Sequence, residues 1–176
     1  DLEKIKAALD EWGPDTAVAA GGDGTVNLVG RALLGRSVRL GILPLGSGNG
    51  LATDLGLPDD LDACLRILLR ARTRRLDALH INDAHYSFHL ADLGFNAKLI
   101  QDFEAEPRRG KFAYVRHFFR NLRYKPKVRY HLQFPDRELH IRAAMVTFAN
   151  ARRYGTGAIV NPVGRPDDGR FEVCIF

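Results

Sequence analysis

The chain has 176 residues, of which 45% are hydrophobic, and its 26 Lys and Arg against 21 Asp and Glu give a formal net charge of +5. This suits one large or two small domains with a sizeable core. No apolar stretch approaches the ~20 residues that cross a bilayer, and there is no signal-peptide pattern. Cys64 and Cys174 are too few for a disulfide framework or a metal set, so we expect a cytoplasmic protein with reduced thiols.

The first part of the chain alternates helices with strands. Apolar residues at helical spacing predict helices over 2–12, 26–33 and 61–68, the last capped by Asp59 or Asp60. Apolar runs at 17–20 and 38–43 predict strands. Each of these strands ends in a glycine-rich turn.

The first turn, at 21–27, reads Gly-Gly-Asp-Gly-Thr-Val-Asn between a strand and a helix. Such a junction directs free backbone N–H groups and the positive end of a helix dipole at one point, which suits a phosphate. Asp23 is unusual there, because a carboxylate repels phosphate unless a divalent cation or a proton lies between them. The loop therefore indicates phosphate chemistry more than passive anion binding.

The second turn, at 44–50, reads Pro-Leu-Gly-Ser-Gly-Asn-Gly. Neither turn is followed by Gly-Lys-Ser/Thr, and no Gly-x-Gly-x-x-Gly is present, which disfavours a P-loop or a Rossmann dinucleotide site. Taken alone, each loop is explained equally well as an ordinary turn between a strand and a helix.

After about residue 75 the pattern changes to strand after strand, so we predict two domains, 1–75 and 76–176. Apolar runs at 76–81 and 86–90 flank a turn at Asn82-Asp83 and predict a hairpin. Apolar and polar residues alternate over 128–134, and 139–148 and 171–176 supply further strands.

A basic segment lies within the second part. Residues 108–129 include nine Lys or Arg and no acid. On a helix, Arg116, Arg120 and Arg123 share one side and the aromatic residues another, which suits a helix on an anionic membrane surface. The alternative is a helix that packs its aromatic residues on the β domain. We expect no nucleic-acid binding, because no recognition motif accompanies the charge.

Together, the two glycine motifs resemble the catalytic domain shared by bacterial diacylglycerol kinases, sphingosine kinases and ceramide kinases. The resemblance continues through 75–77, 94–97, 109–114 and 161–173. It implies a partial α/β nucleotide-binding domain like that of NAD kinases, followed by a mostly β sandwich domain. It also implies ATP and Mg²⁺ as cofactors, a lipid substrate, most simply diacylglycerol, and peripheral association with the membrane.

The resemblance also assigns roles to residues. Asp23 and Asp77 would belong to the catalytic magnesium network. The nucleotide would be bound by Gly21, Gly22, Asp23, Gly24, Thr25, Val26, Asn27 and Ser47. A second, structural magnesium would be held by the Asp168 carboxylate and the carbonyls of Arg165 and Arg170. Without the resemblance, Asp77 is a surface carboxylate and 167–169 an ordinary turn between strands.

The family pattern extends beyond both ends of this sequence. Family members open with a further strand and glycine turn, and they carry a general-base glutamate after the position of Phe176. We therefore expect an internal portion of a lipid kinase that is inactive by itself.

Three alternatives stay open. Gly50 replaces an aspartate found in many bacterial members, and Ser-Gly-Asn-Gly-Leu-Ala is closer to the sphingosine and ceramide kinase form. An NAD kinase shares the first motif, but the second motif and the basic segment argue against it. A non-catalytic nucleotide-binding or lipid-binding module would fit the absent glutamate. A homodimer is also left open.

Overall fold

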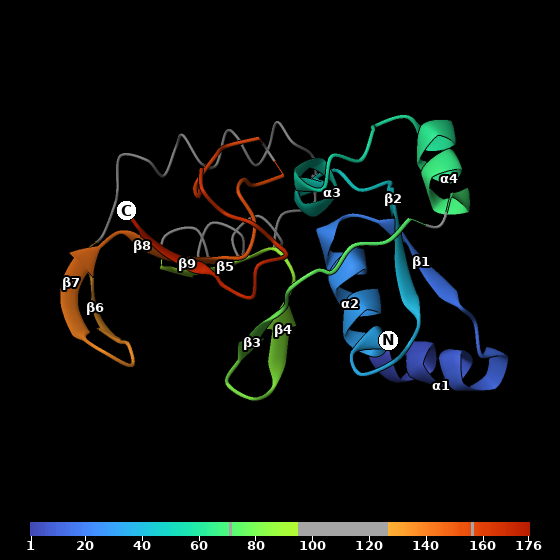
Figure 1. Ribbon diagram of the computed structural model, residues 1–176. Coiled ribbons are helices and arrows are strands. Elements are labelled where there is room, and N and C mark those ends of the chain that lie inside the picture. Colours follow the sequence, from blue (N-terminus) through green and yellow to red (C-terminus); the bar gives the residue numbers. More distant parts are fainter. Residues whose placement is uncertain (71, 95–126, 156) are drawn as a thin grey trace, which may run out of the picture. The chain divides into compact units, whose positions relative to one another are not determined.

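The computed structural model describes residues 1–70, 72–94, 127–155 and 157–176 (Figure 1). These residues form two compact units. Unit 1 consists of Asp1–His89 and Asn150–Phe171, and unit 2 of Leu90–Ala149 and Glu172–Phe176. The chain therefore passes from unit 1 to unit 2, returns, and passes to unit 2 again, whereas the predicted domains divide it once, after residue 75.

Unit 1 begins with the expected alternation of helices and strands. Its elements, in chain order, are α1 (Leu2–Trp12), β1 (Thr16–Gly21), α2 (Asp23–Leu33), β2 (Arg39–Pro44), α3 (Gly50–Asp54), α4 (Leu61–Leu69), β3 (Leu79–Ile81) and β4 (His85–Ser87). The predicted helices over 2–12, 26–33 and 61–68 correspond to α1, α2 and α4. The five-residue α3 was not predicted from the sequence.

Short polar side chains fix where two of these helices begin. The Asp1 carboxylate accepts the Glu3 N–H at the start of α1, and the Asp60 carboxylate accepts the Ala63 N–H at the start of α4. Each satisfies an N–H group that the helix cannot bond itself. Of the two predicted caps for α4, Asp60 is therefore the one used. Helix α1 ends at Trp12, and the next residue, Gly13, has a left-handed φ of 54°.

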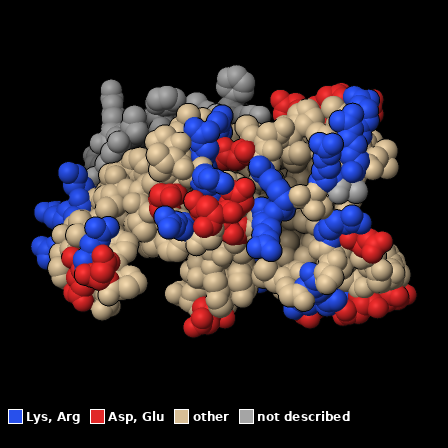
Figure 2. All heavy atoms as spheres, in the orientation of Figure 1, with Lys and Arg blue, Asp and Glu red and all other residues tan. Residues whose placement is uncertain are grey.

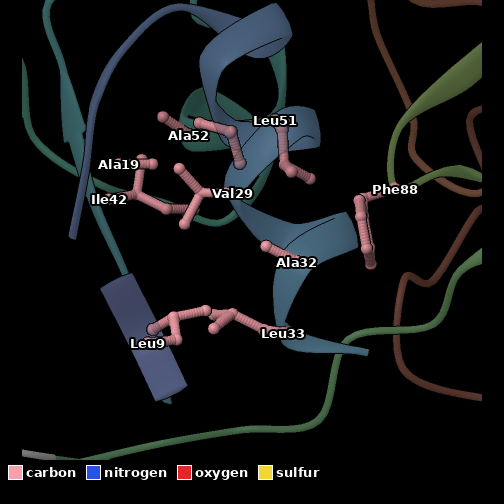
Figure 3. Close-up of a cluster of buried hydrophobic side chains, with 10 residues drawn as sticks. Leu9, Ala19, Val29, Ala32, Leu33, Ile42, Leu51, Ala52 and Phe88 are labelled. Carbon is pink, nitrogen blue, oxygen red and sulfur yellow. The ribbon is translucent and has the colours of Figure 1, made fainter. Parts of the chain in front are cut away.

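The core of unit 1 lies where α2 packs against a parallel sheet. Strands β1 and β2 pair in parallel from Thr16 opposite Arg39 to Gly21 opposite Pro44. Both glycine turns follow the carboxyl ends of these strands, so the parallel pairing brings the turns to the same edge. Figure 3 shows the buried cluster of this core, which comprises Leu9, Ala19, Val26, Val29, Ala32, Leu33, Ile42, Leu51, Ala52 and Phe88.

The predicted hairpin at 76–90 is present as the antiparallel pair β3–β4. Asn82 and Asp83 in its turn have φ of 52° and 51°, values that these two residue types tolerate better than most. Phe88, just after β4, extends into the core, and a Cβ on Gly30 of α2 would overlap its ring. The hairpin is thereby fastened to α2 by an aromatic side chain.

Unit 2 is built from strands. These are β5 (Leu90–Gly94), β6 (Val128–Gln133), β7 (Glu138–Ala143), β8 (Met145–Ala149) and β9 (Glu172–Ile175). Strands β5, β8 and β9 form an antiparallel sheet with β8 in the middle, and β6 and β7 form a separate hairpin.

The stretch 139–148 forms two strands rather than one. Ala143 and Ala144 are both buried, although neighbouring residues of a regular strand point to opposite faces. The Ala144 N–H donates to the Phe176 carbonyl oxygen, and β8 begins at the next residue. The chain therefore changes sheets at this alanine, from the hairpin with β6 to the sheet with β5 and β9.

The predicted fold class, an α/β domain followed by a mostly β domain, is confirmed. Cys64 and Cys174 are both free thiols, and burial raises the pKa of each, which fits packing residues. None of the described helices has the length and apolarity to traverse a membrane. The predicted basic helix, with Arg116, Arg120 and Arg123, lies outside the described residues.

Candidate functional site

The two glycine turns are in direct contact at the carboxyl edge of the β1–β2 sheet. A Cβ on Gly46 would overlap the backbone of Gly22, and a Cβ on Gly22 would lie 3.0 Å from the Gly48 carbonyl oxygen. Such close approach of two backbones requires glycine. The two motifs therefore form one structural site, which neither motif alone could indicate.

Asp23 joins the turns through hydrogen bonds. Its Oδ2 accepts the Gly50 N–H at 2.9 Å, and its Oδ1 accepts the Leu51 N–H at 3.0 Å. These are the first N–H groups of α3, whose N-cap residue Asn49 supplies no side-chain cap. Asp23 thus caps α3 from a position 27 residues earlier in the chain. Its carboxylate, with two lone pairs on each oxygen, keeps further acceptor capacity.

Asn49 shapes the second turn from within. Its Oδ1 accepts the Gly46 N–H at 3.0 Å, while its Nδ2 donates to the carbonyl oxygens of Pro44 and Gly46 at 3.0 and 3.1 Å. Both ends of the amide are therefore used to close the loop. Ser47, the residue predicted to contact nucleotide, is exposed at the tip of this loop.

The start of α2 offers the donors that a phosphate requires. Gly22 is its N-cap and provides no side-chain acceptor, so no side chain caps the start of this eleven-residue helix, where the Thr25 N–H donates to the Gly22 carbonyl oxygen at 2.9 Å. Thr25 is exposed, and the buried Oδ1 of Asn27 has no hydrogen-bond partner. Val26 is 2% exposed and belongs to the core, so only its backbone is available to a nucleotide.

His89 lies between two carboxylates of unit 1. Its Nδ1 is 3.9 Å from Asp23 Oδ2, and its Nε2 is 3.9 Å from Asp54 Oδ2. The Nε2 atom also lies 2.8 Å from the Arg153 carbonyl oxygen, which can only accept, so Nε2 carries a proton. The imidazole thereby leaves Nδ1 facing the Asp23 carboxylate.

The side chain of Asp54, at the end of α3, is 2% exposed and binds the segment that returns to unit 1. Its Oδ2 accepts the backbone N–H groups of Arg152 and Arg153 at 2.7 and 3.1 Å. Its Oδ1 lies 2.9 Å from Arg153 Nε in an ion pair without hydrogen-bond alignment. Arg152 and Arg153 are thus attached to the end of α3 through one carboxylate. Asp54 and His89 were not predicted as site residues, because neither belongs to a motif that we could interpret.

The structure gives a physical reason for Gly50, where many bacterial family members have aspartate. A Cβ at this position would overlap the His89 ring and lie 2.7 Å from the Gly155 nitrogen. The space that a side chain would need is therefore filled in this chain.

Asp77 contacts the predicted metal loop. Its Oδ2 accepts the Gly169 N–H at 2.7 Å, and its backbone N–H donates to the Pro166 carbonyl oxygen at 2.8 Å. Asp168 Oδ1 accepts the Arg170 N–H at 3.1 Å. Two sets of residues that were predicted separately, Asp77 and the 165–170 loop, are therefore brought together.

Asn150 links the neighbourhoods of Asp23 and Asp77. It is 1% exposed, and its Nδ2 donates to the Asp77 and Phe88 carbonyl oxygens, both at 2.9 Å. Its backbone N–H donates to the His89 carbonyl oxygen at 3.0 Å. The connection from Asp77 to Asp23 thus passes through Asn150 and His89.

Among the described residues, side chains alone do not supply a full set of ligands for either predicted magnesium ion. Within the described ranges, one group of at least three His, Cys, Asp or Glu side chains is close enough to share a metal ion, and it lies in unit 2, at His131, Glu138 and His140. A magnesium at Asp168 would need the backbone carbonyls and water, as Mg²⁺ commonly does. Asp168 is exposed, so water can reach its carboxylate.

A cavity of about 870 Å³ also opens in unit 1. Its walls include apolar side chains of α2, β2 and α4, the arginines of 72–75 and Asp77. None of the residues 21–27 or 44–50 lines it. The candidate phosphate site is therefore the exposed edge at the glycine turns, and not this cavity.

Comparison with known proteins identifies both parts of the chain. Residues 1–81 match the family described as diacylglycerol kinase catalytic domain, and residues 91–176 match the YegS C-terminal NAD kinase beta sandwich-like domain. A protein of Chromohalobacter salexigens named "Probable lipid kinase YegS-like" is 36% identical over 99% of this chain and 58% of its own length. A protein of the same name from Cronobacter sakazakii is 29% identical over 100% of this chain and 61% of its own length.

Solved structures show the same fold. A structure described as a diacylglycerol kinase from Bacillus anthracis superimposes with a TM-score of 0.71 at 20% identity, over 97% of this chain and 57% of that one. A second structure from this organism gives 0.78 at 19% identity, over 98% and 60%. The chain thus spans about three fifths of the relatives that it matches. With residues 1–81 matching the diacylglycerol kinase catalytic domain and residues 91–176 matching the YegS C-terminal β-sandwich-like domain, the chain belongs to the diacylglycerol kinase catalytic domain family.

Proposed function

We propose that this chain is part of an ATP-dependent lipid kinase that transfers the γ-phosphoryl group to a lipid hydroxyl, with diacylglycerol as the first candidate. One observation carries the proposal. Asp23 binds the backbone of the second glycine turn, so an acid, an uncapped helix start and two close-packed loops meet at one exposed edge. Phosphoryl transfer depends mainly on positioning and charge neutralisation, which such an edge can provide.

In this proposal the backbone N–H groups at the start of α2 bind ATP phosphates, and the exposed Ser47 hydroxyl is available to the nucleotide. A bound Mg²⁺ would neutralise charge on the phosphates. Asp23 would hold water of the metal's shell with its remaining lone pairs. Because its carboxylate is fixed by two backbone N–H groups, it is oriented before the nucleotide arrives.

Asp77 has a supporting part. It binds the Gly169 N–H and so holds the loop that carries Asp168, which with the Arg165 and Arg170 carbonyls would bind a structural Mg²⁺. We also propose that the basic residues of 108–129 attract the protein to anionic membranes, where its substrate would lie.

The names of the relatives refer to lipid kinases. Two alternatives to diacylglycerol as the substrate are each supported by a specific observation. The sequence Ser47-Gly48-Asn49-Gly50 suits a sphingosine or ceramide type of kinase. The filled space at Gly50, which leaves no room for an aspartate side chain, agrees with this alternative. The match of the second domain to an NAD kinase-like sandwich keeps NAD as a substrate to be tested.

The test uses the full-length gene product and ATP labelled in the γ position. Diacylglycerol, sphingosine and ceramide are offered in mixed micelles, and NAD is offered in solution, each with and without Mg²⁺. We expect label in one lipid, and loss of that label with Asp23→Ala but not with Glu11→Gln, an exposed change in α1. Label in NAD alone, or in no acceptor, would contradict the proposal.

A further inference from the structure

The β6–β7 hairpin carries a polar face that the proposed kinase function does not use. Three cross-strand pairs lie on this face: Arg129 with Arg142, His131 with His140, and Gln133 with Glu138. The other face carries Val128, Tyr130 and Leu132 opposite Ala143, Ile141 and Leu139. Figure 2 shows acidic and basic side chains side by side over this hairpin.

The strand register makes the two histidines direct cross-strand neighbours of the type whose side chains approach most closely. Phe134 N donates to the Arg137 carbonyl oxygen at the end of the hairpin, so hydrogen-bonded pairs alternate from there. By that alternation, His131 and His140 form a non-hydrogen-bonded pair, in which side chains approach most closely. Their rings stack at a centroid distance of 4.2 Å and an interplanar angle of 9°. Two imidazoles are therefore held side by side by the backbone.

Glu138 completes a set of three ligands. Its Oε2 lies 3.1 Å from His131 Nε2, and its Oε1 accepts a hydrogen bond from Gln133 Nε2 at 3.2 Å. One ligand atom from each of His131, Glu138 and His140 lies within 4.8 Å of the other two. Because a carboxylate oxygen only accepts, the hydrogen bond between His131 and Glu138 uses a proton on His131 Nε2. A cation coordinated by these three atoms would replace that proton.

We propose that His131, Glu138 and His140 form a binding site for a divalent transition metal ion of the Zn²⁺ class. Two imidazoles and one carboxylate are a donor set that Zn²⁺, Co²⁺, Ni²⁺ and Cu²⁺ accept, whereas Mg²⁺ prefers oxygen ligands. All three side chains are exposed, so water can complete the coordination. Gln133 orients the carboxylate as an outer partner. The bound ion would cross-link β6 to β7, because His131 belongs to one strand and the other two ligands to the other.

The neighbouring pair limits the affinity. Arg129 and Arg142 lie next to the histidine pair on the same face, and their positive charges repel a cation. Glu138 supplies a single negative charge against them. We therefore expect micromolar rather than structural-zinc affinity, and we expect Arg142→Gln to strengthen binding severalfold.

The experiment titrates ZnCl₂ into the tag-free full-length protein in the presence of a chromophoric chelator and excess Mg²⁺, and repeats the titration with Co²⁺, whose visible absorption reports nitrogen and oxygen ligands. We expect one saturable site per chain. His131→Gln and His140→Gln should each weaken it at least about tenfold, since even changes to outer partners of a metal commonly cost that much. The matched control is His85→Gln, an exposed histidine of the β3–β4 hairpin, which should bind Zn²⁺ as the wild type does.

Zn²⁺ should also raise the melting temperature of the wild type and not that of the His131→Gln, His140→Gln double variant, because only a folded hairpin brings the ligands together. Unchanged Zn²⁺ affinity in the double variant would place the ion elsewhere, and Cys174→Ser would then identify a thiol ligand. Either unchanged affinity in the double variant or the absence of saturable binding in the wild type would overturn the proposal.

Discussion

Acidic side chains serve different purposes at the glycine turns and on the β6–β7 hairpin. In the first region Asp23, Asp54 and Asp77 bind backbone N–H groups 27, 98 and 92 residues away in the chain. On the hairpin, Glu138 contacts the side chains of His131 and Gln133, 7 and 5 residues away. A carboxylate that joins distant segments is part of the tertiary structure, whereas one that contacts its strand neighbour can be removed with little loss of fold. Substitutions in the two regions should therefore differ in which measurement they change.

The largest effect is expected for Asp23→Ala in the complete enzyme. Removing one preoriented charge from the proposed magnesium network should cost roughly 3 to 4 kcal/mol in the transition state, a loss of about 10²- to 10³-fold in turnover. The same change removes the cap of α3, which should lower the free energy of unfolding by about 1 kcal/mol. Turnover is measured by phosphate transfer to lipid, and stability by urea unfolding.

The control for this variant is Glu11→Gln, which should change neither quantity. If Asp23→Ala kept more than about a tenth of the wild-type rate, less than about 1.4 kcal/mol would have been lost. Asp23 would then be a capping residue without a part in catalysis.

A stability effect of similar size is expected for Asp54→Ala. The change leaves Arg153 without its ion-pair partner and two backbone N–H groups without their acceptor, so we expect a loss of about 3 kcal/mol in the free energy of unfolding. Asp136→Ala, in the exposed turn of the hairpin, should change it by no more than about 0.5 kcal/mol. Equal losses of unfolding free energy in the two variants would contradict the proposed difference between the glycine-turn region and the β6–β7 hairpin.

Gly50→Ala tests whether the space beside His89 is full. We expect a loss of about 1 to 3 kcal/mol in the free energy of unfolding, because the new Cβ would overlap the His89 ring and crowd the Gly155 nitrogen. The matched control is Gly24→Ala in the first turn of α2, where a Cβ would meet no atom within 4 Å. Adding His89→Ala to Gly50→Ala should recover part of the loss. Equal stability of the two alanine variants would show that the Gly50 site can expand.

A smaller effect on activity is expected for Asp168→Asn. Because the residue is exposed and its loop is also held by Asp77, the fold should remain and a structural Mg²⁺ should bind more weakly. The Mg²⁺ concentration at half-maximal turnover should therefore rise, and added Mg²⁺ should partly restore the rate. An unchanged Mg²⁺ titration would indicate that residues 167–169 are only a turn.

The smallest effect concerns acid stability. The Arg36 guanidinium donates hydrogen bonds to the Asp10 carboxylate and holds the pKa of Asp10 below its usual value. A carboxylate with a lowered folded-state pKa contributes stability above its unfolded-state pKa, and this contribution is lost as pH falls through the folded-state value. Asp10→Asn should therefore reduce stability slightly at neutral pH and make no difference in strong acid. Parallel curves of stability against pH for variant and wild type would contradict this.

Much of the fold could be predicted from the sequence, because it depends on contacts between residues close in the chain. Apolar spacing over 2–12 and 61–68 predicted α1 and α4, a cap was predicted at Asp59 or Asp60, and Asn82-Asp83 predicted a hairpin turn. The 139–148 stretch was predicted less well, since a change of sheet at Ala144 depends on a partner at Phe176. The helix start of α3 was missed for a related reason, because its cap comes from Asp23.

The sequence alone determined the two glycine motifs, the order of an α/β part before a β part, and the resemblance to a kinase family. Only the tertiary structure decided that Asp23 caps α3, that His89 fills the space beside Gly50, that Asp77 holds the Asp168 loop, and that His131 and His140 stack. The physical reason lies in the kind of contact. Helix spacing and turn chemistry act over a few residues, whereas the partner of a buried carboxylate or the opposite member of a strand pair is fixed only when distant segments fold together.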